Sequence, residues 1–273
     1  MNELRDYSDA KCWCGTSDAA SFFEGPWKVG RDASIGRVTL VKCRACGTVR
    51  TFSLHQVRHT SGDHDDGHYF HETPASWDLL NAALIFRTVK IGAILDVGCN
   101  TGQLMRLLAK RGLSVHGIES NLRAVEYART LDLDVERGLF DSTYVSSLRY
   151  DAVVLSHVLE HIEDPIGALS AAARVLNPGG HLFVFVPNIA SLRARLNMGT
   201  WAPLMPVDHC WHFSPGTLKS LVLDSGDWRS VVSKSTSLGG SSPHVWAWPI
   251  HALASLLNLE QQVALVGRVH GKS

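Results

Sequence analysis

The feature that most constrains the fold is the stretch ILDVGCNTG at residues 94–102, in which a short apolar run ends in an acid and two glycines. Glycine adopts backbone conformations that other residues avoid, so Gly98 and Gly102 predict a tight turn that brings the backbone close to a ligand. Residues 103–111 follow with leucines at helical spacing, and Gly112 ends that pattern. Strand, turn and helix together predict a nucleotide-like binding site in an α/β fold.

A second predicted strand, at residues 114–118, leads directly into Glu119. This acid follows the first glycine by about twenty residues, where nucleotide-binding folds place a carboxylate for ribose hydroxyls. The glycine order is Asp96-x-Gly98-x-x-x-Gly102, without the middle glycine of the dinucleotide fingerprint. A pyrophosphate-containing ligand is therefore the poorer expectation.

This pattern resembles motif I of the class I S-adenosylmethionine (SAM) methyltransferases, D-x-G-x-G-x-G, with Asn100 in place of the central glycine. Four later segments agree with the resemblance: a buried-type strand at residues 151–156, a turn and strand at 177–186, a helix opened by Ser214 and Pro215, and late strands at 229–235 and 261–269. The resemblance implies an α/β fold with a Rossmann-like, seven-stranded SAM methyltransferase core at residues 91–273. Its late strands are expected to form an antiparallel edge.

The resemblance also implies which residues bind the cofactor, because ligands gather at the carboxyl ends of the strands in such folds. The expected contacts are Gly98 and Gly102 for the methionine part, Glu119 for the ribose, Phe140 and Asp141 near the adenine, and Ser156 facing the methyl group. Further cofactor contacts are expected from Asp96, Asn100 and Ser120, and from Tyr69 in the segment before the core.

Four of the six cysteines form two close pairs near the start of the chain, Cys12-x-Cys14 and Cys43-x-x-Cys46. In a reducing compartment such pairs indicate a metal rather than disulfides, and zinc is the usual ion for clustered thiolates. The first pair is one residue shorter than the usual C-x-x-C. We expect a zinc-knuckle-like segment at residues 1–60 with a structural zinc, and four unliganded thiols are the alternative. Cys99 and Cys210 lie outside this pattern and are expected to pack as small hydrophobic groups.

Residues 61–90 are expected to hold a lid and the first core helix. The stretch at residues 55–72 holds five histidines, at positions 55, 59, 64, 68 and 71, together with Asp63, Asp65 and Asp66, and it is either a solvated loop, a lid or a second metal site. The helix is predicted at residues 74–90, with an apolar face of Trp77, Leu80, Leu84 and Ile85.

The catalytic candidates follow the strand at 151–156. His157, Glu160 and His161 are spaced i, i+3 and i+4, which groups them on one face if the segment is helical. An imidazole beside a carboxylate suits a general base. A zinc-type N-terminus on a methyltransferase core is similar to sugar C-methyltransferases, which implies Glu160 and His161 as the pair that serves the acceptor. His157 and His209 are further catalytic candidates, and we expect the acceptor-pocket wall to hold Trp201, His209, Trp211, His212 and Phe213.

Metal binding is the alternative role for the same residues. Ubiquinone-pathway O-methyltransferases and small-RNA 2′-O-methyltransferases carry E-x-x-E-H here as ligands for a divalent cation, and this chain has His157-x-x-Glu160-His161. An imidazole in place of the first carboxylate shifts the preference from magnesium toward zinc, iron or nickel. His209 or His212 is available as a further ligand.

Composition narrows the class of acceptor. Lys plus Arg equals Asp plus Glu at 26 each, so the chain has no basic surplus for a phosphate backbone. This balance argues against a nucleic-acid substrate. The resemblance implies an enzyme, a methyltransferase acting on a small molecule such as a natural product or saccharide, at oxygen, nitrogen or carbon. A methyltransferase of RNA or another macromolecule, and a non-catalytic binding protein, remain as alternatives.

Two further segments bear on location. The most apolar stretch, residues 245–259, is shorter than the roughly 20 residues that a membrane span needs. Residues 1–11 lack the apolar region of a signal peptide. We expect a cytoplasmic protein without a membrane partner. The sequence leaves the acceptor, its reacting atom and the oligomeric state open.

Overall fold

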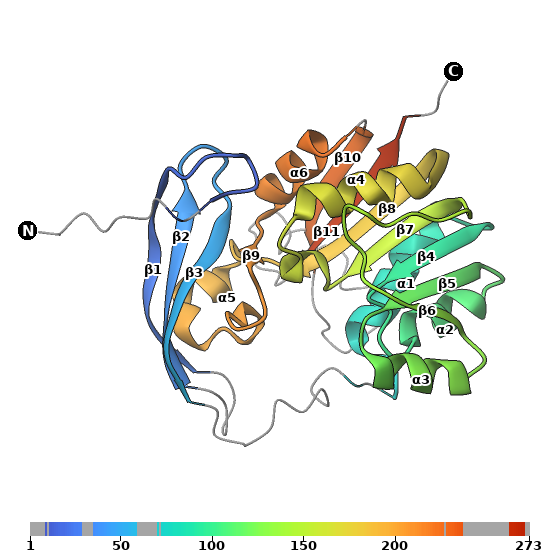
Figure 1. Ribbon diagram of the computed structural model, residues 1–273, viewed down its shortest axis with the longest axis horizontal. Helices are drawn as coiled ribbons and strands as arrows, with labels where there is room; N and C mark the ends of the chain where they lie inside the picture. Colours follow the sequence, from blue (N-terminus) through green and yellow to red (C-terminus); the bar gives the residue numbers. More distant parts are fainter. Residues whose placement is uncertain are drawn as a thin grey trace, which may run out of the picture.

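The computed structural model describes residue 9, residues 11–28 and 35–58, residue 70, and residues 72–226, 228–236 and 262–270. In these parts of the chain the strands form two sheets, a seven-stranded sheet on one side and a smaller sheet on the N-terminal side (Figure 1).

The large sheet has the strand order β10-β11-β8-β7-β4-β5-β6. Its strands are β4 (Ala93–Val97), β5 (Ser114–Glu119), β6 (Asp134–Arg137), β7 (Tyr150–Ser156), β8 (Leu176–Pro187), β10 (Trp228–Thr236) and β11 (Gln262–Val269). Neighbours from β6 through β8 are parallel, β11 is antiparallel to β8, and β10 is antiparallel to β11. This order confirms the predicted Rossmann-like methyltransferase fold. The last strand, β11, lies between β8 and β10, so β10 forms the edge of the sheet.

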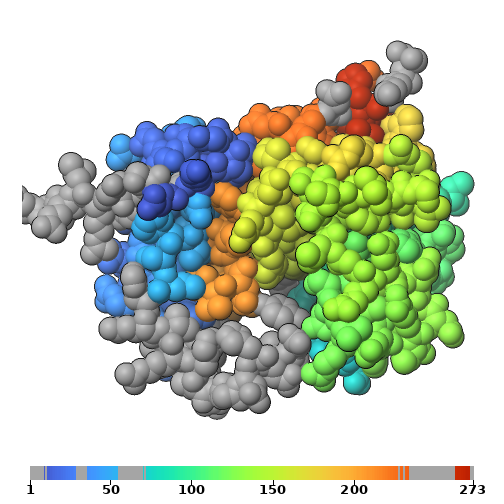
Figure 2. Space-filling view, viewed as in Figure 1, coloured from blue at the N-terminus to red at the C-terminus, as the bar shows by residue number. Residues whose placement is uncertain are grey.

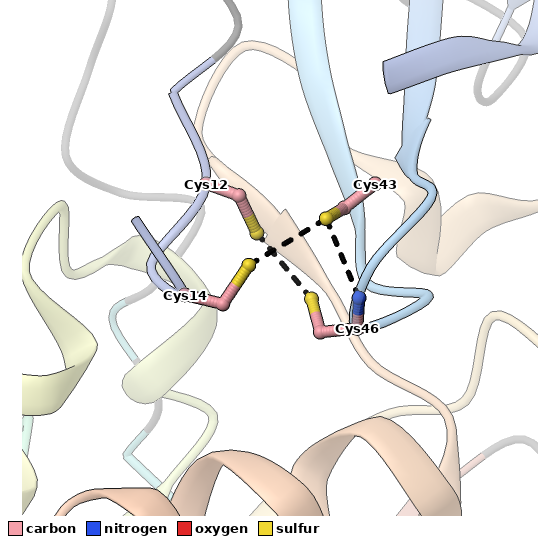
Figure 3. Close-up of side chains that lie close together, drawn as sticks. All are labelled: Cys12, Cys14, Cys43 and Cys46. Carbon is pink, nitrogen blue, oxygen red and sulfur yellow. Dashed lines mark hydrogen bonds between the residues drawn. The ribbon is translucent and has the colours of Figure 1, made fainter. Parts of the chain in front are cut away.

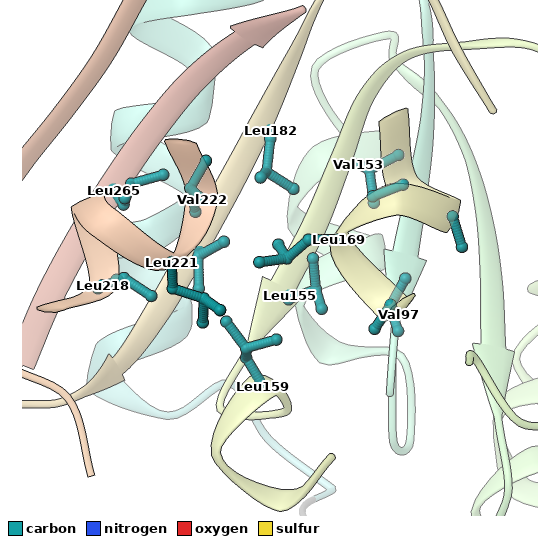
Figure 4. Packing of buried hydrophobic residues seen from close by; sticks show 14 of the residues in the cluster. Val97, Val153, Leu155, Leu159, Leu169, Leu182, Leu218, Leu221, Val222 and Leu265 are labelled. Atoms are coloured by element: carbon teal, nitrogen blue, oxygen red, sulfur yellow. The ribbon is translucent and has the colours of Figure 1, made fainter. Parts of the chain in front are cut away.

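Helices cover both faces of this sheet because its central strands are apolar on both sides. They are α1 (Ser76–Thr88), α2 (Gln103–Ala109), α3 (Leu122–Thr130), α4 (Pro165–Val175) and α6 (Pro215–Asp224). Leu169 of α4 and Leu221 of α6 pack on one face with Leu155 and Leu265 (Figure 4). Ile85 of α1 and Leu108 of α2 pack on the other. No helix in the described part of the chain is long and apolar enough to cross a membrane.

The predicted helix starts at residues 165 and 215 are confirmed by their caps. The Asp164 carboxylate accepts a hydrogen bond from the Gly167 amide at 2.9 Å, and Pro165 occupies the first helical position. Ser214 and Thr217 form a capping box ahead of α6. The turn expected at residues 177–180 is instead part of β8, where the pairing with β7 shifts its register.

The apolar face expected on the first core helix is wrong at Leu80, which is 43% exposed. The buried side of α1 holds Asn81, Ala82 and Ile85. The Asn81 amide donates to the Ser156 hydroxyl at 3.0 Å and accepts from the Gln262 amide at 3.0 Å. A buried amide needs such partners, so these bonds fix the helix with Asn81 inward and Leu80 outward.

The small sheet is antiparallel, with the order β1-β2-β3-β9. Its strands are β1 (Ala19–Lys28), β2 (Ile35–Cys43), β3 (Val49–Arg58) and β9 (Trp211–His212). The described residues between 11 and 58 therefore form three strands of a sheet and a cysteine cluster, more than the small knuckle that was expected. The fourth strand comes from the connection between β8 and α6, so the two parts of the chain share a sheet (Figure 1).

The same connection packs on the small sheet. It contains α5 (Leu192–Leu196) and the short 3-10 helices η3 (Met198–Thr200) and η4 (Ala202–Leu204). Trp201 is 1% exposed and lies in one apolar cluster with Trp27 and Leu40. This burial and the β3–β9 pairing hold the N-terminal sheet firmly against the large domain.

Candidate functional site

The predicted turn after β4 has the backbone that its glycines indicate. Gly98 and Gly102 have φ of 64° and 78°, and a Cβ on either would lie within 2.5 Å of a neighbouring side chain. Asn100, which occupies the place of the central glycine, is also left-handed at φ 51°. Asparagine tolerates this region better than most residues, which explains the departure from the family pattern.

Glu119 at the end of β5 joins two loops of this site. One carboxylate oxygen accepts from the Asn100 amide at 2.9 Å, and the other accepts from the Asn121 amide at 2.8 Å. The carboxylate therefore fixes the glycine turn from the neighbouring strand. Its remaining lone pairs suit the ribose hydroxyls for which the sequence predicts it.

Asp96 is 2% exposed, and its Oδ2 has no hydrogen-bond partner among the described residues. Burial raises the pKa of this carboxyl well above its usual value, and the charges of Asp78 and Glu119 raise it further. A buried carboxyl oxygen without a partner is costly, so the geometry fits a donor supplied by a bound ligand.

The other expected cofactor contacts lie in different settings. The Ser156 hydroxyl accepts a hydrogen bond from the Asn81 amide. Asn81 was not identified from the sequence, although a polar side chain among the apolar positions of a helix could have indicated it. Phe140 is buried beside Tyr144, with ring centroids 4.8 Å apart. Ser120 is exposed and Asp141 is partly exposed, and the carboxylate of Asp141 accepts hydrogen bonds from the amide and hydroxyl of Thr143. Tyr69 lies outside the described residues, so its role stays a prediction.

Beside the cofactor loops, one carboxylate and three histidines meet at the end of β7. Glu160 lies in η2 (Leu159–His161) and is 1% exposed. Its Oε1 is 3.5 Å from Nδ1 of His157, a residue with left-handed φ of 56°. Ligand atoms of Glu160, His161 and His209 lie within 4.8 Å of one another. The structure thus brings together all four residues predicted for catalysis.

His209 reaches this cluster from a distant part of the chain. The Cys210 amide donates to the Glu160 carbonyl at 2.9 Å, which ties the loop before β9 to η2. The rings of His161 and His209 then meet edge to face with centroids 4.6 Å apart. His209 therefore joins the cluster because of where the loop before β9 lies, and no local sequence motif indicates this contact.

Hydrogen bonds and burial set the protonation of the cluster. Nδ1 of His161 lies 3.1 Å from the Asp208 carbonyl, so the imidazole carries its proton on Nδ1 when neutral and its lone pair on Nε2. Burial lowers the pKa of His209 to about 4 despite the opposing Glu160 charge. Burial by itself would raise the pKa of Glu160, but the His157 imidazole, whose Nδ1 lies 3.5 Å from Oε1, and the charges of His209 and His161 lower it. The cluster is therefore an ionised carboxylate among imidazoles.

Only two of the five residues expected in the acceptor-pocket wall line a cavity, and their role in binding the acceptor stays a prediction. Trp201 and Phe213 are core residues at 1% and 0% exposure, because each packs between layers of the fold. His212 is also buried, and its Nε2 lies 3.0 Å from the Thr51 hydroxyl. His209 and Trp211 line a cavity of about 470 Å³ between the N-terminal sheet and the large domain.

The four N-terminal cysteines converge, as the sequence predicted (Figure 3). Sγ atoms are 3.5 Å apart for Cys12 and Cys46, and 3.6 Å apart for Cys14 and Cys43. Four thiolates around a tetrahedral zinc, each at about 2.3 Å, lie about 3.8 Å from one another. The donor set and its spacing therefore fit a zinc ion. Cys99 packs in the core as expected, and Cys210, which is half-buried at the cavity, packs against the core as well.

Comparison with known proteins agrees with this fold. A family model described as methyltransferase domain matches residues 65–226. Among curated proteins, the ubiquinone biosynthesis O-methyltransferase of Alkalilimnicola ehrlichii is 41% identical over 97 residues, which cover 33% of this chain and 39% of that protein. The chain thus spans about two fifths of that relative's length.

Solved structures share the fold at low sequence identity. A SAM-dependent methyltransferase from Archaeoglobus fulgidus aligns with a TM-score of 0.52 and 21% identity, covering 70% of this chain and 94% of the other. The CcbJ methyltransferase from Streptomyces caelestis aligns with a TM-score of 0.53 and 16% identity, covering 72% and 91%. Both cover more of this chain than the curated relative does.

Proposed function

This chain belongs to the methyltransferase-domain family, and we propose that it transfers a methyl group from SAM to a small-molecule acceptor. The observation that carries the proposal is the turn at Gly98 and Gly102 held by the Glu119 carboxylate, beside the Asp96 oxygen that has no hydrogen-bond partner in the described part of the chain. The name of the O-methyltransferase relative supports a small molecule and an oxygen acceptor atom. Natural products and saccharides are the acceptor classes that we favour.

When bound, SAM supplies an electrophilic methyl group, so the protein must align the acceptor and take up its proton. We assign the proton to Nε2 of His161, whose orientation the Asp208 carbonyl sets through Nδ1. The buried Glu160 carboxylate stabilises the imidazolium that forms. The four N-terminal thiolates are assigned to a structural zinc.

The cofactor assignment is tested at Glu119. We expect Glu119→Ala to weaken SAM binding by about tenfold or more in calorimetry, since it removes charge-assisted hydrogen bonds that hold the turn. Glu126→Ala, at an exposed position on α3, is the matched control and should bind SAM as the wild type does. No SAM binding by the wild type, or equal affinity in both variants, would contradict the assignment.

A second candidate is a methyltransferase that uses a metal at the same cluster. The observation in its favour is that Glu160, His161 and His209 place three ligand atoms within 4.8 Å. Both carboxylate oxygens of Glu160 lack a hydrogen-bond donor among the described residues, and a cation would satisfy them. Two imidazoles and one carboxylate favour zinc, iron or nickel over magnesium.

Metal stoichiometry separates the two mechanisms. If the cluster binds a catalytic metal, elemental analysis should find one equivalent fewer in His209→Ala than in the wild type. The cysteine site is the internal reference, because His209→Ala leaves its four thiolates intact. Equal metal content in the two proteins, with wild-type activity that survives a strong chelator, would leave the general-base mechanism.

A further inference from the structure

The cavity between the N-terminal sheet and the large domain has a polar end that the methyl-transfer chemistry leaves unused. Its lining includes Lys11, Arg50 and Thr51 from the N-terminal part, and Glu163, His209 and Trp211 from the large domain. On the face shown in Figure 2, the blue N-terminal part meets the orange and yellow segments of the large domain. A ligand in this cavity contacts His209, one of the residues that meet at Glu160.

Arg50 is held in one orientation by three features of the fold. It lies on β3, where it pairs with Trp211 of β9, and its guanidinium carbon stacks 5.2 Å from the centre of the Trp211 ring. Nη1 donates to the Lys11 carbonyl. Stacking and this bond leave the Nε–Nη2 edge, and Nε is buried without a hydrogen-bond partner among the described residues. That edge is a planar pair of donors that matches the two oxygens of an oxyanion.

The neighbouring charges indicate which oxyanion fits. Lys11 adds a second cation to the lining, and Glu163 adds one carboxylate. Two cations and one anion among these three side chains give a net charge of about +1, which suits a monoanion. A phosphate monoester carries nearly two negative charges near neutral pH, and Glu163 would oppose the second.

We propose that this cavity is the acceptor site and that Arg50, with Lys11, binds a carboxylate on the acceptor. The acceptor then extends from the guanidinium of Arg50 to His209, which places its nucleophile toward the cluster with His161. This inference rests on the proposed function and narrows the acceptor to a small carboxylic acid. Lys11 directly precedes Cys12 of the proposed zinc site, and its carbonyl accepts a hydrogen bond from Arg50, so the metal also supports the acceptor site.

Binding of benzoate, followed by calorimetry without SAM, tests the proposal. We expect benzoate to bind at least tenfold more tightly than benzamide, because only the carboxylate forms charge-assisted bonds to the Arg50 edge. Arg50→Gln should weaken benzoate binding by about 10- to 100-fold. Arg50→Lys keeps the charge and loses the planar pair of donors, so its affinity for benzoate should lie between those of the wild type and Arg50→Gln.

Three comparisons make the result decisive. Arg37→Gln, at an exposed arginine on the neighbouring strand β2, should bind benzoate as the wild type does. Lys11→Gln changes an exposed side chain, so weaker benzoate binding there supports the site without disturbing the core. Glu119→Ala should keep benzoate affinity, which separates this test from the cofactor assignment. Equal binding of benzoate and benzamide, no effect of Arg50→Gln, or tighter binding of phenyl phosphate than of benzoate would overturn the proposal.

Discussion

Replacing His161 by alanine should lower turnover by about 100-fold or more while changing SAM affinity by less than about twofold. The imidazole is oriented by the Asp208 carbonyl and lies beside the buried Glu160 carboxylate, so it is placed to accept the acceptor's proton through Nε2. The glycine turn and Glu119 belong to other elements and keep their geometry in this variant. Turnover at saturating SAM and calorimetric SAM binding measure the two quantities.

The control for this variant is His270→Ala, which removes an exposed histidine bonded to Arg229 at the end of the last strand. Its turnover should equal that of the wild type. Added imidazole should restore part of the activity of His161→Ala, because the small base can occupy the space of the lost ring. An unchanged rate in His161→Ala would reject this residue as the base.

Replacing Cys43 by serine should remove one zinc equivalent and lower the free energy of unfolding by about 4 kcal/mol or more, because the binding free energy of a structural metal is also folding free energy. The melting temperature should fall by roughly 10 °C. Cys43 ends β2, and its cluster joins the N-terminal loop to the turn before β3. Cys12 and Cys43 also pack with the core that contains Leu218 of α6, so loss of the metal loosens the contact between the two parts of the chain.

Elemental analysis and thermal unfolding of the purified protein measure both effects. Cys210→Ser is the matched control, since Cys210 lies outside the cluster and should keep its metal content. Wild-type protein without zinc, or a Cys43→Ser variant of unchanged metal content and stability, would show that the four thiols are unliganded.

Local sequence patterns were sufficient for the elements of the core. The glycines at 98 and 102, the caps at Asp164 and Ser214, and the alternation of strands and helices each depend on residues a few positions apart. The resemblance that these patterns carry implied the parallel sheet and its antiparallel edge, and both are confirmed. The helix face was predicted wrongly at Leu80 because the bonds of Asn81 to Ser156 and Gln262 join three distant segments.

In the candidate site, too, local spacing predicted some of the residues and tertiary contacts placed the others. Spacing grouped His157, Glu160 and His161, but it could not place His209 against them, because that contact needs the β3–β9 pairing and the bond from Cys210 to Glu160. The cavity lined by Arg50 and Trp211 was equally hidden, since its walls come from two sheets. Trp201 and Phe213 are aromatic and were predicted to line the pocket, yet both are buried in the core.

By itself the sequence determined the fold, the cofactor turn and the pairing of cysteines, since hydrophobic periodicity, backbone preference and ligand chemistry act over short distances along the chain. The tertiary structure decided which distant residues meet: the fourth strand of the small sheet, the histidine at Glu160 and the arginine at the cavity. Such contacts depend on strand register and on packing between layers, which no local pattern specifies.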